Sequence, residues 1–222
     1  MIHLFRSYYI YFVVSTVLFF VFTTIAFAAK VDDLHIEKMP QWVEYRALAH
    51  NEEVPVDEIT DGVFYQLLDT QIKVTDEDQI VKYYRYVETV VNKAGVDYTS
   101  QVNIDFDPTY QKLALNTLFI IRDGKRIDKL KSAKISLLNR ETDLENQIYN
   151  GTITLNALLD DIQIGDTIDY SFTRYGSNPV YKGIFSYSRE LTWSVPVQDQ
   201  YVRVLWVKVE PLFVRTRKIS PQ

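Results

Sequence analysis

The sequence predicts an all-β fold, mainly antiparallel and sandwich-like. Short runs rich in Val, Ile, Tyr, Phe and Thr recur from Val63 onward, separated by turn residues at the spacing that all-β sandwiches show. One run alternates strictly between apolar and polar residues, and three prolines fall between runs, where a missing N–H breaks no ladder. With 222 residues, 47% of them hydrophobic, the chain holds enough apolar material for one sizeable core.

The N-terminal segment has the features of a secretory signal peptide. No charged residue occurs from Tyr8 to Ala29, the stretch follows Arg6, and it ends in the small residues of Ala26-Phe27-Ala28. This pattern predicts cleavage after Ala28, so that residues 1–28 are removed. The alternative is a retained membrane anchor, because the length of the uncharged stretch is close to the roughly 20 residues that a spanning helix needs. In both cases we expect export, to the periplasm or the extracellular space, with a membrane contact only if the segment is retained.

The rest of the chain divides into an arm, a domain and a short tail. Residues 29–62 are polar and acidic, with Trp42-Val43 as their only strong apolar pair, and we expect an arm that lies along the domain. Residues 63–215 contain the strand-like runs and form the β domain. Residues 216–222 are expected to be a tail or the start of a following domain that is missing from this chain.

Eight runs in the domain are predicted to be strands. They are Phe64 to Val74, Ile80 to Asn92, Asp97 to Phe106, Lys112 to Arg122, Thr152 to Leu159, Asp166 to Tyr175, Phe185 to Trp193 and Tyr201 to Glu210. Pro108, Pro179 and Pro196 fall between them. Asp123-Gly124 supplies the positive φ angles of a tight hairpin turn after the fourth run.

The cleanest alternation lies in the sixth run, where side chains follow the two-residue period of a strand. Ile168, Tyr170 and Phe172 face one way and are predicted to be buried. Asp169 and Ser171 face the other way and are predicted to be exposed.

One segment departs from the strand pattern. Residues 137–150 place Leu137, Leu144 and Ile148 among charged side chains, and Gly151 follows as a natural helix stop. We expect one short helix or an ordered loop here, over one edge of a sheet.

Several classes of function are excluded or weakened by what the chain lacks. It contains no Cys, which removes thiolate nucleophiles, Cys-based metal sites and disulfides. Besides His3, only His35 and His50 supply imidazoles, and both lie in the acidic arm. The net charge of -5 gives no basic footprint for nucleic acid, and the scattered glycines form no phosphate cradle. No catalytic, cofactor-binding or metal-ligating residue is therefore assigned.

A cluster of carboxylates around Gly165 has two interpretations. Asp160, Asp161, Asp166 and Asp169 could bind Ca²⁺ or form an acid/base pair. Their spacing lacks the alternating oxygen ligands of a calcium loop, so a turn between two strands is favoured.

Aromatic side chains also gather in two regions, and they could form a surface that binds peptide or glycan. They are Tyr83, Tyr84, Tyr86, Tyr175, Tyr181, Phe185 and Tyr187. Core packing is the favoured interpretation, because aromatics are the normal filling of a β core.

Several turn motifs in a fixed order resemble a known bacterial family. They include Asp107-Pro108-Thr109-Tyr110, Asp123-Gly124, Ile164-Gly165-Asp166 and Gly176-Ser177-Asn178-Pro179, within about Val63 to Glu210. The chain is similar to the domain of unknown function found N-terminal to transglutaminase-like domains in exported proteins. The resemblance implies a sandwich-like β domain that is not itself the enzyme. The matching positions are interpreted as structural turns: Asp107, Pro108, Tyr110, Asp123, Gly124, Gly165, Asp166, Asn178 and Pro179.

The leading hypothesis for function is a non-catalytic accessory or interaction domain of an exported transglutaminase-like protein. Its expected partner is a transglutaminase-like domain, in the same chain or a separate one, and no cofactor is expected. The first alternative is a stand-alone module that binds extracytoplasmic peptide or glycan through exposed Tyr. The second is a metal- or carboxylate-dependent hydrolase that uses the Asp160 to Asp169 region.

Overall fold

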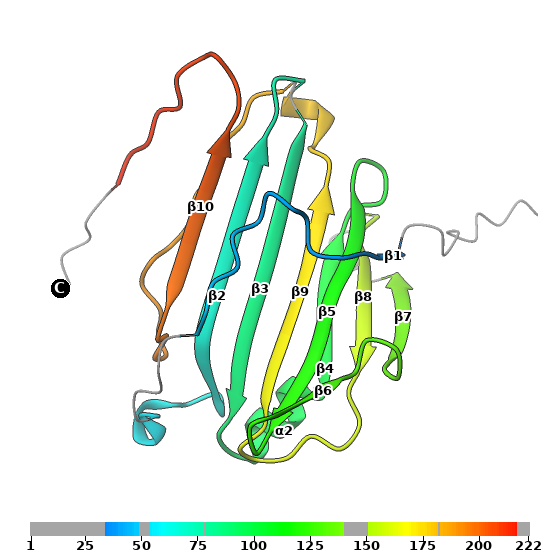
Figure 1. Cartoon of the computed structure of the whole chain (residues 1–222), viewed down its shortest axis with the longest axis vertical. Coiled ribbons are helices and arrows are strands. Elements are labelled where there is room, and N and C mark those ends of the chain that lie inside the picture. Colours follow the sequence, from blue (N-terminus) through cyan, green and yellow to red (C-terminus); the bar gives the residue numbers. More distant parts are fainter. Residues whose placement is uncertain (1–33, 49–53, 78, 140–150, 182, 217–222) are drawn as a thin grey trace, which may run out of the picture. The chain divides into compact units, whose positions relative to one another are not determined.

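A computed structural model describes residues 34–48, 54–77, 79–139, 151–181 and 183–216 of the chain. The predicted signal segment, residues 1–28, lies outside the described residues. None of the helices in the described part is long and apolar enough to cross a membrane. The described residues are mostly strands, joined by turns and one short helix, which confirms the all-β fold class (Figure 1).

The strands form two sheets. Their bounds are β1 Leu34–Ile36, β2 Val63–Val74, β3 Ile80–Val90, β4 Gln101–Phe106, β5 Lys112–Arg122, β6 Lys125–Asp128, β7 Lys134–Asn139, β8 Ile153–Leu158, β9 Thr167–Tyr175 and β10 Gln200–Trp206. The larger sheet has the order β1-β5-β9-β3-β2-β10, with β6 paired to β5, and the smaller sheet has the order β4-β8-β7. Pairing is antiparallel except at the two ends of the larger sheet, where β1 runs parallel to β5 and β10 runs parallel to β2.

One face of the larger sheet, called here the inner face, packs against the smaller sheet. The shared core contains Leu115 and Leu118 from β5 and Ile168 from β9, together with Ile104 from β4 and Leu155 from β8. All five side chains are almost fully buried. The alternation of apolar residues along each strand therefore places two apolar faces against each other, which is the packing of a sandwich.

The run predicted as a strand from Asp97 to Phe106 begins as a helix instead. Lys93–Thr99 form α2, and the strand starts only at Gln101. Asn92 caps the helix, because its side-chain oxygen accepts a hydrogen bond from the backbone N–H of Gly95 at 3.2 Å. An Asn at this position satisfies a donor that a helix start leaves free, so one local side chain decides the outcome.

The run predicted as a strand from Phe185 to Trp193 forms no ladder. Phe185 and Tyr187 are half-buried while Ser186 and Ser188 are exposed, so the segment does have the two-residue period of an extended chain. It lies on the inner face of the sheet, where Phe185 and Tyr187 pack against the side chains of β2 and β3. Burial on one side produces the alternation of a strand without backbone pairing, and this is why the prediction was wrong.

The helix or ordered loop predicted at 137–150 begins in a strand, because Leu137 to Asn139 are the last residues of β7. Residues 140–150 lie outside the described part of the chain. Strand β1, the hairpin strand β6 and most of β7 were not predicted, since each is short and lies at or near a sheet edge.

The burial predicted for strand β9 is correct on one face and wrong on the other. Ile168 and Phe172 are buried, and Tyr170 is half-buried, as the alternation predicts. Asp169 and Ser171, predicted to be exposed, are each only 1% exposed. The outer face of the sheet is covered because the chain after β1 crosses in front of β5, β9, β3 and β2 (Figure 1).

Candidate functional site

Asp123 and Gly124 form the tight turn that joins β5 to β6. Their φ angles are 50° and 72°, in the left-handed region that this turn requires. Arg122 and Lys125 pair directly across the hairpin. These positions shape the backbone of the hairpin.

The carboxylates around Gly165 are held by one arginine. Arg122 donates from Nε to Asp166 Oδ1 and from Nη2 to Asp166 Oδ2, both at 2.8 Å, and from Nη1 to Asp161 Oδ2 at 3.0 Å. Burial alone would raise the pKa of Asp166, but the hydrogen bonds from Arg122 and from the backbone N–H of Gln163, together with the charge of Arg122, outweigh it and hold the pKa below its usual value. A fully paired carboxylate of lowered pKa is suited to structure rather than to proton transfer.

The described residues contain no group of three or more His, Cys, Asp or Glu side chains that could hold a metal ion. Asp169, the fourth carboxylate of the predicted cluster, lies on β9 and pairs elsewhere, with Arg85. Three carboxylates of the sequence cluster, Asp161, Asp166 and Asp169, are thus divided between two ion-paired groups.

Asp107 begins a turn that leads to a cavity. Its Oδ1 accepts hydrogen bonds from the backbone N–H and the hydroxyl of Thr109 at 3.0 and 2.6 Å. Gly176 approaches this turn so closely that a Cβ there would lie 2.1 Å from the carbonyl oxygen of Tyr110. Asn178 turns the chain in a similar way, since its Oδ1 accepts from the N–H of Val180 at 2.9 Å.

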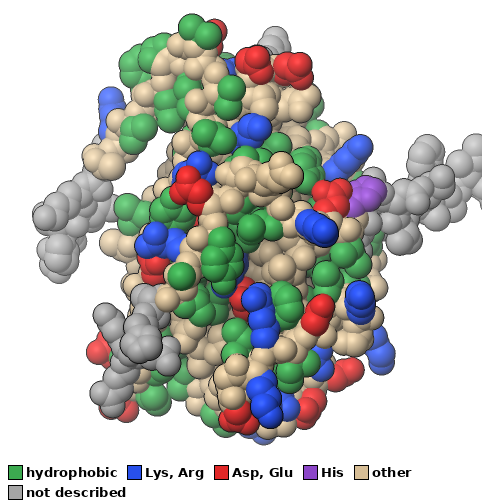
Figure 2. Space-filling model, viewed as in Figure 1, with side chains coloured by type: hydrophobic (Ala, Val, Ile, Leu, Met, Phe, Trp, Pro, Cys, Tyr) green, Lys and Arg blue, Asp and Glu red, His purple; other side chains and the backbone are tan. Residues whose placement is uncertain are grey.

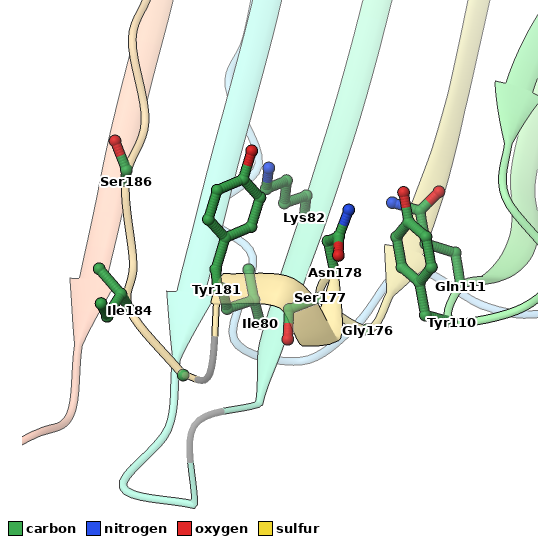
Figure 3. Close-up of a pocket in the computed structure, with 11 residues that line it drawn as sticks. Ile80, Lys82, Tyr110, Gln111, Gly176, Ser177, Asn178, Tyr181, Ile184 and Ser186 are labelled. Atoms are coloured by element: carbon green, nitrogen blue, oxygen red, sulfur yellow. The ribbon is translucent and has the colours of Figure 1, made fainter. Parts of the chain in front are cut away.

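The cavity lies where β3 begins and β9 ends, and its volume is about 390 Å³. Residues that line it include Ile80, Lys82, Tyr110, Gln111, Asn178 and Tyr181. The polar ends of Lys82, Asn178 and Tyr181 point in the same direction (Figure 3). Tyr110 and Asn178, two positions interpreted from sequence as turn residues, therefore also line this cavity. Lys82 and Gln111 were not predicted as site residues.

A second polar cluster lies on the outer face of the sheet, under the arm. Arg85 donates from Nε and Nη2 to the two carboxylate oxygens of Asp169, at 2.9 and 3.0 Å, and both side chains are almost fully buried. Arg85 Nη1 also donates to the carbonyl oxygen of Arg46 in the arm at 2.7 Å. The buried ion pair thus ties two central strands to the arm.

Amide side chains of the sheet hold the arm at two further points. Gln71 and the backbone of Glu44 exchange two hydrogen bonds, of 2.8 and 3.0 Å. Asn116 Nδ2 donates to the carbonyl oxygens of Glu37 and Lys38. Seen from this side, the molecule carries charged side chains of both signs among apolar ones (Figure 2). These contacts account for the burial of polar residues on a face that the sequence predicts to be wet.

Glu88 is a third polar side chain that is buried, on the inner face of the sheet near the C-terminal end of β3. It is 6% exposed and borders a small cavity with Tyr98 and Tyr170. Burial raises its pKa to about 7, although a hydrogen bond from the Tyr170 hydroxyl acts in the opposite direction. No sequence pattern marks this group, because Glu88 stands in an otherwise ordinary strand run.

We expect the stability of the protein to fall as pH rises through the range in which Glu88 titrates. The folded state keeps the Glu88 proton up to about pH 7, whereas the unfolded chain loses it near 4.5, the ordinary pKa of a glutamate. The free energy of unfolding should therefore drop by about 2 kcal/mol between pH ~5 and pH ~8. Urea denaturation at the two pH values measures this difference in the free energy of unfolding.

The matched variant for this prediction is Glu88→Gln, which should be more stable than the wild type at the higher pH and depend less on pH. Burial also raises the pKa of Asp69, to about 6, so part of the pH dependence should remain in the variant. An identical pH dependence in the two proteins would contradict the assignment to Glu88.

The geometry defines a class, a two-sheet β domain with a polar cavity at one end of its larger sheet. The family described as a domain of unknown function with a solved structure (DUF3857) matches residues 77–222. The chain therefore belongs to that family. A search of curated proteins finds no match to the chain.

Solved structures also contain similar chains. The crystal structure of a protein named a putative protease from Parabacteroides distasonis is similar with a TM-score of 0.47 and 12% identity, over 54% of this chain and 24% of that one. The chain thus spans about a quarter of the length of that protein.

Proposed function

We propose that this chain is a non-catalytic accessory domain of an exported protein, and that it docks a transglutaminase-like domain of the same or a separate chain. The proposal combines the family membership with the sequence resemblance to domains that precede transglutaminase-like domains. The absence of Cys from the sequence supports the non-catalytic part, since a transglutaminase-type reaction needs a thiolate.

The observation that carries the proposal is the concentration of exposed apolar side chains near the C-terminal strand. More than half of the large apolar side chains that are exposed in the described residues fall within 180–214. They are Val180, Tyr181, Ile184, Leu191, Trp193, Val207, Val209, Phe213 and Val214. Exposed apolar side chains that gather in one part of a chain favour a contact with another protein. Strand β10 beside it ends the sheet, so it also offers an edge with no described partner.

The test is a binding measurement between this chain and a purified transglutaminase-like domain from the same genome, by isothermal titration calorimetry. The double variant Val209→Ser and Phe213→Ser changes two side chains that are 100% and 89% exposed, so folding should not suffer. We expect it to weaken binding at least about tenfold, as the loss of apolar anchors does.

The matched control is Tyr98→Ser, which changes an exposed aromatic residue on α2, away from the C-terminal strand. It should bind like the wild type. Absence of binding by the wild type, or an equal loss in the control, would reject the docking surface.

The non-catalytic part has its own test. The chain is incubated with a glutamine-containing peptide and a primary amine, with and without a divalent metal, and ammonia release and peptide cleavage are followed. We expect neither. Turnover that survives repurification and disappears in Asp161→Asn or His50→Ala would establish the hydrolase alternative instead.

A second candidate function, binding of peptide or glycan, is favoured by the cavity. Tyr110 and Tyr181 line it together with the amides of Gln111 and Asn178, and aromatic faces beside amides suit both kinds of ligand.

A further inference from the structure

Three cations on the inner face of the larger sheet lack a counter-charge among the described residues. Lys82, Arg174 and Arg189 make no ion pair with any carboxylate in the described part of the chain. The arginines that lie elsewhere contrast with them. Five of the arginines elsewhere in the described residues, Arg46, Arg85, Arg122, Arg126 and Arg203, each pair with an Asp or a Glu, whereas Arg215 is exposed to solvent.

These three side chains are not fully exposed to solvent. All are half-buried, and the Nε atoms of Arg174 and Arg189 are shielded from solvent without any acceptor. Arg174 lies over the rings of Tyr84 and Phe172, with its Cζ 5.3 and 5.4 Å from their centroids. Aromatic faces stabilise a cation, but they do not neutralise its charge.

Lys82 and Arg174 are also direct neighbours, because they are opposite each other in the register of β3 and β9. Like charges directly across a sheet destabilise it. Burial lowers the pKa of Lys82, and the charge of Arg174 lowers it further. Two half-buried cations side by side are therefore a cost to the fold that an anion would remove.

Lys82 lines the cavity of about 390 Å³ described above, a volume in the range of small-molecule sites. No described Asp or Glu lines the cavity. The other polar side chains that line it are two amides and four hydroxyls, all of which can donate hydrogen bonds: Gln111, Asn178, Tyr110, Tyr181, Ser177 and Ser186. The site thus offers a positive charge surrounded by donors, with tyrosine rings for the body of a ligand (Figure 3).

We propose that this cavity binds a small organic anion, whose carboxylate or phosphate group contacts Lys82 and is attracted by Arg174. The ion supplies the charge that the described residues do not provide, and Asn178 and Tyr181 donate to its remaining oxygens. The cavity shares Tyr181 and Ile184 with the apolar docking surface, but the two proposals are tested with different variants, at Lys82 and at Val209 with Phe213, so either can fail without the other.

The test uses two pairs of probes that differ in charge. N-acetyl-alanyl-alanine is compared with its C-terminal amide, and glucose 6-phosphate is compared with glucose. Binding to the ¹⁵N-labelled protein is followed by NMR chemical shifts. We expect the charged member of at least one pair to bind at least about tenfold more tightly than the neutral member, with shifts at Lys82, Gln111 and Asn178. Which pair responds distinguishes a carboxylate from a phosphate ligand.

The decisive variant is Lys82→Met, which removes the charge and keeps the length of the side chain. It should lose the preference for the charged probe while its unfolding midpoint stays equal to or above that of the wild type, because an unpaired half-buried charge has gone. Lys125→Met, an exposed lysine in the β5–β6 hairpin, is the control and should bind like the wild type.

Three outcomes would overturn the proposal. They are no binding of either charged probe to the wild type, equal binding of charged and neutral probes, and unchanged binding by Lys82→Met. Equal binding of glucose and glucose 6-phosphate would favour a neutral glycan in the same cavity.

Discussion

Replacing Arg85 with methionine is expected to destabilise the protein by about 3–5 kcal/mol, the usual cost of removing one partner of a buried ion pair. The change leaves the carboxylate of Asp169 buried, with only the half-exposed Arg126 still near it, at 3.2 Å. It also removes the hydrogen bond that Arg85 donates to the carbonyl oxygen of Arg46. Urea denaturation of the purified protein gives the change in the free energy of unfolding.

Two further variants separate the ion pair from general damage to the core. Arg126→Met removes the more exposed partner of Asp169 and should cost less than about 1 kcal/mol. The double variant Arg85→Met and Asp169→Leu should regain a large part of the loss, because no charge then remains buried. If Arg85→Met and Arg126→Met cost the same, the importance assigned to the buried pair is wrong.

Tyr170→Ala is expected to cost about 3 kcal/mol, as large-to-small changes in a core do. The ring of Tyr170 packs edge-on against that of Tyr86, with centroids 5.5 Å apart, and it belongs to the side chains packed on the main core. Differential scanning calorimetry measures the effect.

Tyr170→Phe provides the comparison for that prediction. It keeps the ring and removes only a long hydrogen bond, 3.4 Å, to Glu88, so its cost should be under about 1 kcal/mol. An unchanged midpoint for Tyr170→Ala would show that the ring contributes nothing to the core.

The strands with strong local signals could be predicted from the sequence. The run Lys112 to Arg122 matches β5 at both ends, because a polar turn precedes it and Asp123-Gly124 follows it. The strand predictions from sequence patterns failed at two kinds of place. One is the Asn92 cap, which turns the start of a predicted strand into a helix, and the other is where a distant segment buries a strand face. Asp169 and Ser171 are buried by an arm that lies over 120 residues earlier in the chain, and no local pattern could reveal that cover.

Among the site residues, too, those in local turn motifs were found from the sequence, whereas those brought together by strand pairing were not. Tyr110 and Asn178 were found because they stand in turn motifs, although only as structural positions. Lys82 and Arg174 become a pair only through the register between β3 and β9, which the sequence does not state. Glu88 and Arg85 stand in the same strand run and were predicted as ordinary strand residues, since their environment depends on β9 and the arm.

The parallel pairing of β10 with β2 affects how the chain folds during its synthesis. The last residue of β2 is Val74 and the last of β10 is Trp206, so about 130 residues must be synthesised after β2 before its outer edge can be covered. At about 5–20 residues per second, that edge stays open for roughly 7–26 seconds during translation. An open edge can pair with other nascent chains. Chaperone binding to nascent chains stalled before residue 200 should therefore exceed binding to the full-length chain after its release from the ribosome.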